Sequence, residues 1–245
     1  MPLSADKIFA ILDLYSEKKT PLSVAEISSL LNAPQSSVYR HVRLLKEKGF
    51  LMETEKGAYQ LGYRFIELAN IVRMDQRLST IALPYMKKLT HDLGETTILS
   101  VISELSVVCV ETVPSLQSIK VSSEQGKIVP IYAGASSKVI LAYQSEELID
   151  QLFSKQLVKK FTEKTLATKT ELVENLAEIR EKGYAISDSE IDVGVFSYGF
   201  PIRDSKRNVF ASLTVAGPTH RMLQKNEQEI VLKCKQAVSE IEKYV

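Results

Sequence analysis

The sequence predicts an α+β protein in which a small N-terminal domain, 1–61, is joined by a helical linker, 62–77, to a larger domain, 78–245. Three observations predict this organisation. Apolar residues recur at helical spacing in three short segments before position 50. A strand–turn–strand pattern follows them directly. Beyond position 95, consecutive apolar strands alternate with helices, which is typical of an antiparallel sheet covered by helices.

Composition is that of an ordinary globular chain of 245 residues, with 44% hydrophobic and 25% charged residues. No apolar run approaches the roughly 20 residues of a membrane span, and the N-terminus lacks the pattern of a signal peptide. Cys109 and Cys234 lie far apart, which favours reduced thiols in the cytoplasm. The three histidines, His41, His91 and His220, share no metal-ligand spacing, so no metal is expected. No phosphate-binding glycine loop is found, and no cofactor is expected.

The first two helices are predicted from apolar spacing and from their ends. In 4–17 the apolar residues follow a helical period, Ser4 is a candidate N-cap, and residues 18–21 break the helix. A second helix, 23–31, opens on the capping-box sequence Ser23-Val-Ala-Glu26.

A third helix and a hairpin complete the N-terminal domain. The helix spans 34–48, with Pro34 suited to its first position and Gly49 ending it as a left-handed cap. Residues 50–53 and 58–61 are predicted strands joined by a tight turn. Three short helices followed by such a hairpin are the elements of a winged helix-turn-helix.

In this motif the second helix of the pair enters the major groove of DNA, and its N-terminal and outward residues reach base edges. The segment 34–48 concentrates four basic residues against one acidic residue. The candidate DNA-binding residues are Gln35, Ser36, Ser37, Tyr39, Arg40 and Arg43 on this helix and Lys56 at the hairpin tip. Two alternatives stay open: these charges solvate a helix face, or the winged helix is a protein-interaction module.

The linker carries a wide apolar stripe, formed by Phe65, Ile66, Leu68, Ala69 and Val72. A lone connecting helix does not need such a stripe, so the same helix of a second chain is expected to cover it. Packing on the chain's own domain is the alternative. A homodimer or a dimer of dimers is therefore expected, in line with the two-fold symmetry of most helix-turn-helix operators.

The larger domain is predicted as strands and helices in succession. A helix over 79–93 is expected to kink or restart at Pro84. The further strands are 98–102, 107–113, 195–203 and 209–216, and the further helices are 136–143, 146–153, 171–182 and 224–244.

Several segments together resemble the IclR family of bacterial regulators, in order and in spacing. They are Ser37–Phe50, Tyr59–Gly62, Gly94–Thr97, Val129–Ala142, Ile179–Ala185, Glu190–Gly194 and Ser212–Pro218. The resemblance covers nearly the whole chain. It implies a GAF-like ligand-binding fold for the larger domain, and a regulator that binds an operator in double-stranded DNA and a small-molecule effector.

Two arguments, one physical and one from the family resemblance, predict the candidate effector site. Gly134, Ala135 and Ser136 lie where a loop enters a helix, and exposed N–H groups there attract a carboxylate. An ordinary helix cap at Ser136 or Ser137 explains the same residues, and the resemblance favours the ligand. The resemblance also implies pocket roles for Asp188 or its neighbour Ser187, together with Val195, Ser197 and Thr214.

Two departures from the family pattern lie near this site: Ser137 stands where the family often has Gly, and Ser197 where it often has Cys. No sequence motif of catalysis is found. Glu190 and Asp192 could act as an acid–base pair, although loop carboxylates are usually solvated. An enzyme built on the same ligand-binding fold, with the winged helix as an accessory, is therefore the alternative to a regulator that is not an enzyme.

Overall fold

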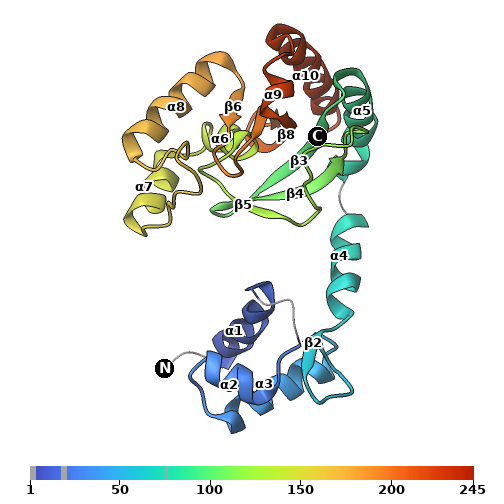
Figure 1. Ribbon diagram of the computed structural model, residues 1–245, viewed down its shortest axis with the longest axis vertical. Helices are drawn as coiled ribbons and strands as arrows, with labels where there is room; N and C mark the ends of the chain where they lie inside the picture. The colour runs from blue at the N-terminus through green and yellow to red at the C-terminus, as the bar shows by residue number, and fades with distance from the viewer. Residues whose placement is uncertain (1–3, 18–20, 75–76) are drawn as a thin grey trace. The chain divides into compact units, whose positions relative to one another are not determined.

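The computed structural model describes residues 4–17, 21–74 and 77–245. They form two compact units, Met1–Gln76 and Arg77–Val245 (Figure 1). The division between the units falls inside the predicted linker 62–77. Residues 75 and 76 of that linker lie outside the described residues, and so do Lys18, Lys19 and Thr20, which were expected to end the first helix.

The first unit is a winged helix-turn-helix, as the sequence predicts. Its elements are α1 (Ser4–Glu17), α2 (Val24–Leu30), α3 (Gln35–Glu47), β1 (Leu51–Glu53), β2 (Tyr59–Leu61) and α4 (Arg64–Met74). The hairpin β1–β2 is extended by Leu22, which exchanges two backbone hydrogen bonds of 2.8 Å with Tyr59. This bridge fastens the wing to the segment that precedes α2.

The ends of these helices follow local side-chain chemistry. The predicted capping box is present: Ser23 Oγ accepts from the Glu26 N–H, and the Glu26 carboxylate accepts from the Ser23 N–H at 2.7 Å. Gly49 follows α3 with φ +76°, as a left-handed cap requires. The predicted start of the third helix is wrong by one position. Pro34 is the N-cap of α3, and Gln35 is the first helical residue.

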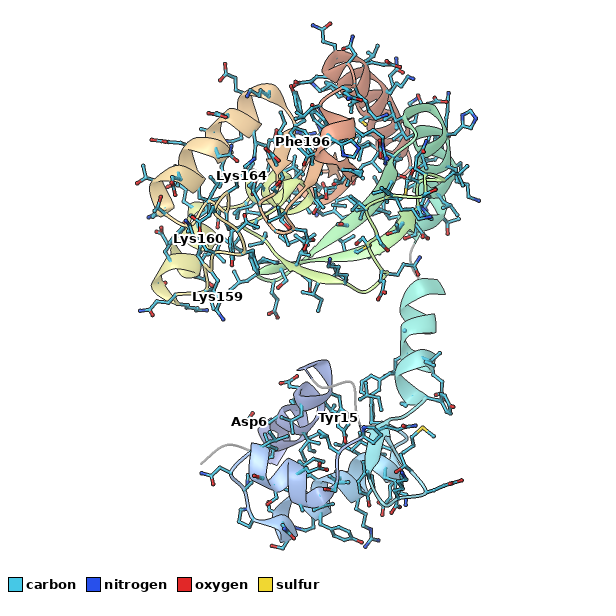
Figure 2. All side chains as sticks on the ribbon, viewed as in Figure 1. Asp6, Tyr15, Lys159, Lys160, Lys164 and Phe196 are labelled. Atoms are coloured by element: carbon cyan, nitrogen blue, oxygen red, sulfur yellow. The ribbon has the colours of Figure 1, made fainter. Side chains whose placement is uncertain are left out.

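One face of α3 forms the core of the first unit. Val38, Val42 and Leu45 are buried there beside Ile11 of α1 and Ile27 of α2. Because this stripe faces inward, the opposite face of α3 is left to solvent. Tyr15 of α1 also belongs to this core, and its hydroxyl donates to the Tyr59 carbonyl at 3.0 Å (Figure 2).

The second unit is an antiparallel sheet with helices on both faces. Its elements are α5 (Arg77–Leu93), β3 (Thr96–Ser103), β4 (Ser106–Val113), β5 (Ile128–Pro130), α6 (Ala135–Leu141), α7 (Glu146–Ser154), α8 (Lys169–Lys182), β6 (Ala185–Asp188), β7 (Val195–Arg203), β8 (Val209–Pro218), α9 (Thr219–Met222) and α10 (Glu227–Glu242). The strand order is β5-β4-β3-β8-β7-β6, and every neighbouring pair is antiparallel. No helix within the described ranges has the length and apolar character that crossing a membrane requires.

Three details of this unit differ from the prediction. Helix α5 runs through Pro84 without ending, so the restart that was one of the two predicted outcomes does not occur. The predicted helix 224–244 begins three residues later, at Glu227, because Asn226 caps it by accepting from the N–H groups of Gln228 and Glu229. The short helix α9, which precedes it, was not predicted. Strands β5 and β6 were missed; each has only three or four residues and pairs at an edge of the sheet.

The two faces of the sheet pack differently. Phe196, Tyr198 and Phe200 of β7 belong to the core beneath α5 and α10. The alternate residues of β7 face α6 instead. A Cβ at Gly199 would lie 2.4 Å from the Ala135 carbonyl oxygen, so only glycine allows α6 to approach β7 this closely. This contact sets the start of α6 directly against the sheet.

Candidate functional site

The solvent face of α3 carries most of the predicted DNA-binding residues. Gln35, Ser36, Tyr39, Arg40 and Arg43 are exposed, opposite the buried stripe of the same helix. Ser37 is half-buried at the edge of this face. The arrangement presents polar and basic side chains from the first turn to the third, as a helix that reads a groove requires.

Two ion pairs order the basic side chains of α3. Arg43 Nε donates to Glu47 at 2.8 Å, and this hydrogen bond raises the pKa of the guanidinium. Lys46 donates to Glu53 of β1 at 2.5 Å and so joins the helix to the wing. Both pairs are exposed and contribute little to stability. They orient the cations.

The tip of the wing is a tight turn with Gly57 at φ +73°. Lys56 precedes this glycine and is exposed, so its ammonium is free to meet a phosphate. The turn is closed by the Thr54 N–H, which donates to the Ala58 carbonyl at 2.8 Å. All seven predicted DNA-binding residues therefore belong to the first unit's third helix and wing.

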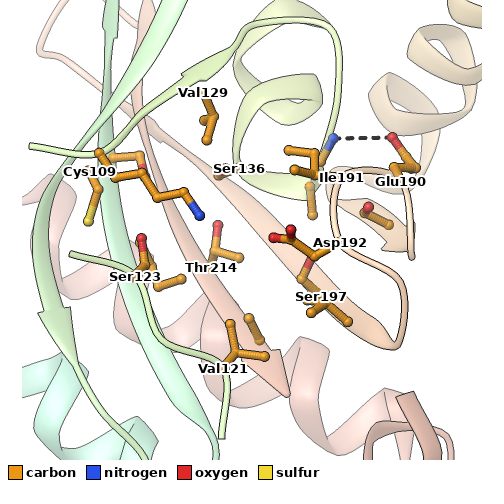
Figure 3. Close-up of a pocket in the computed structure, with 18 of the residues that line it drawn as sticks. Cys109, Val121, Ser123, Val129, Ser136, Glu190, Ile191, Asp192, Ser197 and Thr214 are labelled. Carbon is orange, nitrogen blue, oxygen red and sulfur yellow. Dashed lines mark hydrogen bonds between the residues drawn. The ribbon is translucent and has the colours of Figure 1, made fainter. Parts of the chain in front are cut away.

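The second unit contains a cavity of about 100 Å³ between the start of α6 and the sheet face beneath it (Figure 3). Residues 121–123 and the β6–β7 loop contribute its sides. Seven of the eight predicted effector-site residues line it: Gly134, Ala135, Ser136, Ser187, Val195, Ser197 and Thr214. Segments far apart in the sequence are thus brought together around one space.

Asp188 is the exception, because it does not line the cavity, whereas its neighbour Ser187 does. Successive residues of a strand point to opposite faces, so Asp188 points away from the cavity that Ser187 lines. The Asp188 carboxylate pairs with Lys164 and accepts from Ser189 Oγ at 2.9 Å. The hydrogen bond from Lys164 lowers the pKa of this carboxyl. Lys164 comes from the segment between α7 and α8 (Figure 2).

The predicted anion cradle at Gly134 already holds a carboxylate of the protein itself. The Gly134 N–H donates to Glu190 Oε2 at 3.1 Å (Figure 3). The other carboxylate oxygen of Glu190 lies 2.5 Å from the ammonium of Lys138, and both side chains are buried. The negative charge of Glu190 is therefore compensated within the fold by Lys138.

Hydroxyl groups dominate the polar lining of the cavity. They belong to Ser100, Ser122, Ser123, Ser136, Ser187, Ser197 and Thr214. Thr214 is 3% exposed, and its Oγ1 has no hydrogen-bond partner among the described residues. A buried hydroxyl without a partner costs about 1–3 kcal/mol, so this atom is poised to bond a polar group in the cavity.

Sequence reasoning missed several lining residues. Lys127 and Asp192 both line the cavity, and so does Cys109 of β4. Lys127 lies next to β5, a strand too short to be predicted, so nothing in the local sequence placed it near the cavity. Asp192 belongs to the segment Glu190–Gly194, which carries part of the family resemblance, and only the fold shows that Asp192 faces the cavity (Figure 3). Within the described residues, no group of three or more His, Cys, Asp or Glu side chains could hold a metal ion.

A winged helix-turn-helix with an exposed basic third helix is the architecture of a DNA-binding regulator. Residues 4–54 match the family model described as the IclR helix-turn-helix domain. Residues 71–243 match the model described as the bacterial transcriptional regulator IclR C-terminal domain. The chain belongs to the IclR family of bacterial transcriptional regulators.

Characterised relatives resemble the chain over nearly its whole length. The regulator KipR of Bacillus subtilis is 28% identical, covering 98% of this chain and 95% of its own. The regulator XynR of Escherichia coli is 28% identical over 91% of this chain and 89% of its own. The acetate operon repressor of Salmonella typhimurium is 25% identical over 94% of this chain and 85% of its own. These relatives are transcriptional regulators.

Solved structures share the fold. The IclR protein of Thermotoga maritima superimposes with a TM-score of 0.73 at 28% identity, over 98% of this chain and 97% of that chain. An IclR homologue of Microbacterium hydrocarbonoxydans, crystallised with 4-hydroxybenzoate, gives a TM-score of 0.81 at 24% identity, over 98% of both chains. The fold predicted from the sequence is thereby confirmed.

Proposed function

We propose that this regulator binds a DNA operator through α3 and the wing, and that a small polar effector in the second unit's cavity sets its operator affinity. The observation that carries the effector proposal is the Thr214 hydroxyl, which is buried and unpaired in a cavity lined by hydroxyl groups. The engineered apolar cavity that binds benzene measures about 150 Å³. A space of about 100 Å³ favours a more compact ligand.

The proposed DNA contacts follow from exposure and charge. Arg40 and Arg43 lie on the outer face of α3 and can bond guanine or phosphate. Gln35, Ser36, Ser37 and Tyr39 belong to the first turns of the helix, where N-terminal residues of a recognition helix reach base edges. Lys56 supplies a phosphate contact from the wing.

We also propose that the functional unit is a homodimer or a dimer of dimers. Helix α4 leaves Ile66 57% exposed, and the preceding Tyr63 is 69% exposed. Apolar side chains left open on a connecting helix favour a second copy of the same helix as their cover. Two recognition helices would then read a pseudo-palindromic operator with half-sites about one or more helical turns apart.

Repression is the proposed mode, since several of the relatives are repressors by name. An effector changes operator affinity only by binding the DNA-competent and DNA-incompetent states differently. A coupling of about 1–3 kcal/mol is ordinary, and DNA must change effector affinity by the same factor.

The test is operator binding by fluorescence anisotropy with a panel of small carboxylic acids, using the intact protein and a duplex recovered by selection from random DNA. Thr214→Val is the site variant, and Ser205→Ala, which changes an exposed hydroxyl in the β7–β8 turn, is its control. We expect at least one acid to shift operator affinity, and the shift to shrink in Thr214→Val alone. An undiminished response in Thr214→Val would place the effector site elsewhere.

A further inference from the structure

Three charged side chains line the cavity: Lys127, Glu190 and Asp192. Glu190 is already satisfied, because its carboxylate bonds the Lys138 ammonium and the Gly134 N–H. A carboxylate held by these two contacts stabilises the fold and is not available to pair with a ligand. A ligand therefore meets two remaining charges, one positive and one negative.

Lys127 and Asp192 are exposed, and neither side chain has an ion-pair or hydrogen-bond partner in the part of the chain that the structure describes. They approach the cavity from opposite edges of the sheet. Lys127 directly precedes β5 at one edge, whereas Asp192 lies in the loop between β6 and β7 at the other. The cavity is thus flanked by one unpaired cation and one unpaired anion.

The backbone holds both residues in place. The Cys109 N–H donates to the Lys127 carbonyl at 2.9 Å, which fixes Lys127 against β4. In the β6–β7 loop, the Val195 N–H donates to the Asp192 carbonyl at 3.2 Å, and the Ser189 N–H donates to the Val195 carbonyl at 2.7 Å. Thr165 Oγ1 also donates to the Glu190 carbonyl at 2.6 Å. Charges presented on a fixed backbone require less ordering when a ligand binds.

The hydroxyl lining lies around the same space. The side chains of Asp192, Ser197 and Thr214 surround one central space (Figure 3). A hydroxyl can donate to a carboxylate or accept from an ammonium, so Ser197 and Thr214 can serve either end of a ligand. The lining therefore offers hydrogen-bond partners to both charged groups of a ligand that carries one positive and one negative charge.

We propose that the effector is a compact zwitterion of the amino-acid class, with its carboxylate at Lys127 and its ammonium at Asp192. This inference rests on the proposed function and specifies the ligand of the same cavity. A plain carboxylic acid of equal size would satisfy Lys127 and leave Asp192 facing the ligand without a cation. The site therefore distinguishes an amino acid from the corresponding hydroxy acid by the charge that meets Asp192.

The experiment measures binding to the intact protein by calorimetry and by the shift in unfolding temperature. The probes are the proteinogenic amino acids, each compared with its α-hydroxy acid and with the amine that lacks the carboxylate. We expect at least one amino acid to bind about tenfold or more tightly than both of its partners, because each lost contact is a charge-assisted hydrogen bond. Asp192→Asn should abolish the preference for the amino acid over the hydroxy acid, and Lys127→Met should weaken both acids.

The controls are Glu124→Gln and Lys120→Gln, which neutralise exposed charges in the same region that do not line the cavity. They should bind as the unaltered protein does. If hydroxy acids bind as tightly as every amino acid, and Asp192→Asn changes neither, the zwitterion proposal is overturned while an acid effector in this cavity still stands. If none of the three classes binds at millimolar concentration, the zwitterion proposal is also overturned, and other carboxylic acids still test the proposed function.

Discussion

The buried ammonium of Lys138 lies 2.5 Å from Glu190 Oε1, and this ion pair joins α6 to the loop that borders the cavity. Lys138 also donates to Asn175 Oδ1 at 2.8 Å and to the Ile186 carbonyl at 3.1 Å. All three ammonium protons have acceptors, as a buried cation requires. One lysine therefore connects α6, α8, β6 and the β6–β7 loop.

Lys138→Met should lower the free energy of unfolding by about 3–5 kcal/mol, because it leaves the Glu190 carboxylate buried without a cation. Urea denaturation measures the change. Adding Glu190→Gln to Lys138→Met should recover part of the loss, since the uncompensated charge is removed. Lys169→Met, which breaks the exposed pair with Asp150, is the control and should cost less than about 1 kcal/mol. Strict additivity of the two buried substitutions would mean that the pair is not coupled.

Arg43→Ala should weaken binding to the selected operator by about 1–3 kcal/mol and relax specificity at one base position, if Arg43 reads a base. Lys56→Ala should weaken binding to all duplexes alike and reduce the salt dependence, because a phosphate contact carries no sequence information. Anisotropy titrations on operator and random duplex at several salt concentrations separate the two effects. Lys87→Ala, an exposed substitution in the second unit, is the control for net charge.

Glu47→Gln tests the role of the pair that Arg43 makes in the free protein. Glu47 holds the Arg43 guanidinium at 2.8 Å and places a negative charge beside the proposed DNA surface. Removing that charge should tighten binding to every duplex, most clearly at low salt. Weaker binding would instead show that Glu47 positions Arg43 for its contact.

Local sequence signals predicted much of this structure, and long-range pairing accounts for the rest. The capping box at Ser23 and the left-handed Gly49 are local features, and the sequence located both ends correctly. The choice between the neighbours Asp188 and Ser187 stayed open for a different reason: β6 was not predicted, so the alternation that turns Asp188 away from the cavity was unknown. Lys127 reaches the cavity only because β5 pairs with β4, which no local pattern encodes.

Thr214→Val should stabilise the ligand-free protein by about 1 kcal/mol while weakening the effector response, because it replaces an unpaired buried hydroxyl by a methyl group of the same shape. Functional sites commonly trade stability for binding in this way. Thr97→Val is the matched control. Thr97 is fully buried, but its Oγ1 bonds Thr90 Oγ1 at 2.8 Å, so its removal should destabilise the protein. Equal losses in the two variants would show that the Thr214 hydroxyl is already satisfied.

Ile66→Lys should shift the protein toward monomers without unfolding it, because Ile66 is 57% exposed on α4 and the proposed dimer buries it. Sedimentation velocity measures the association state, and circular dichroism checks that the helices persist. The same variant should lose cooperative protection of the two half-sites in a footprint. An unchanged association state would place the dimer contact on another surface.

The two thiols should react differently with small reagents, because one faces the cavity and the other faces only core. Burial raises the pKa of Cys234 to about 12, so this thiol stays protonated at pH 8. Cys109 lines the cavity and should be labelled first by methyl methanethiosulfonate, with Cys109→Ala as the control that leaves only slow labelling. Reactivity of Cys234 should rise as the pH increases toward 12, because a raised pKa keeps this thiol protonated until then.

An effector bound in the cavity should slow the labelling of Cys109 and leave Cys234 unaffected, as mass spectrometry of the modified peptides would record. Labelling of Cys109 that is as slow as that of Cys234 would mean that the cavity does not admit even a reagent of this size.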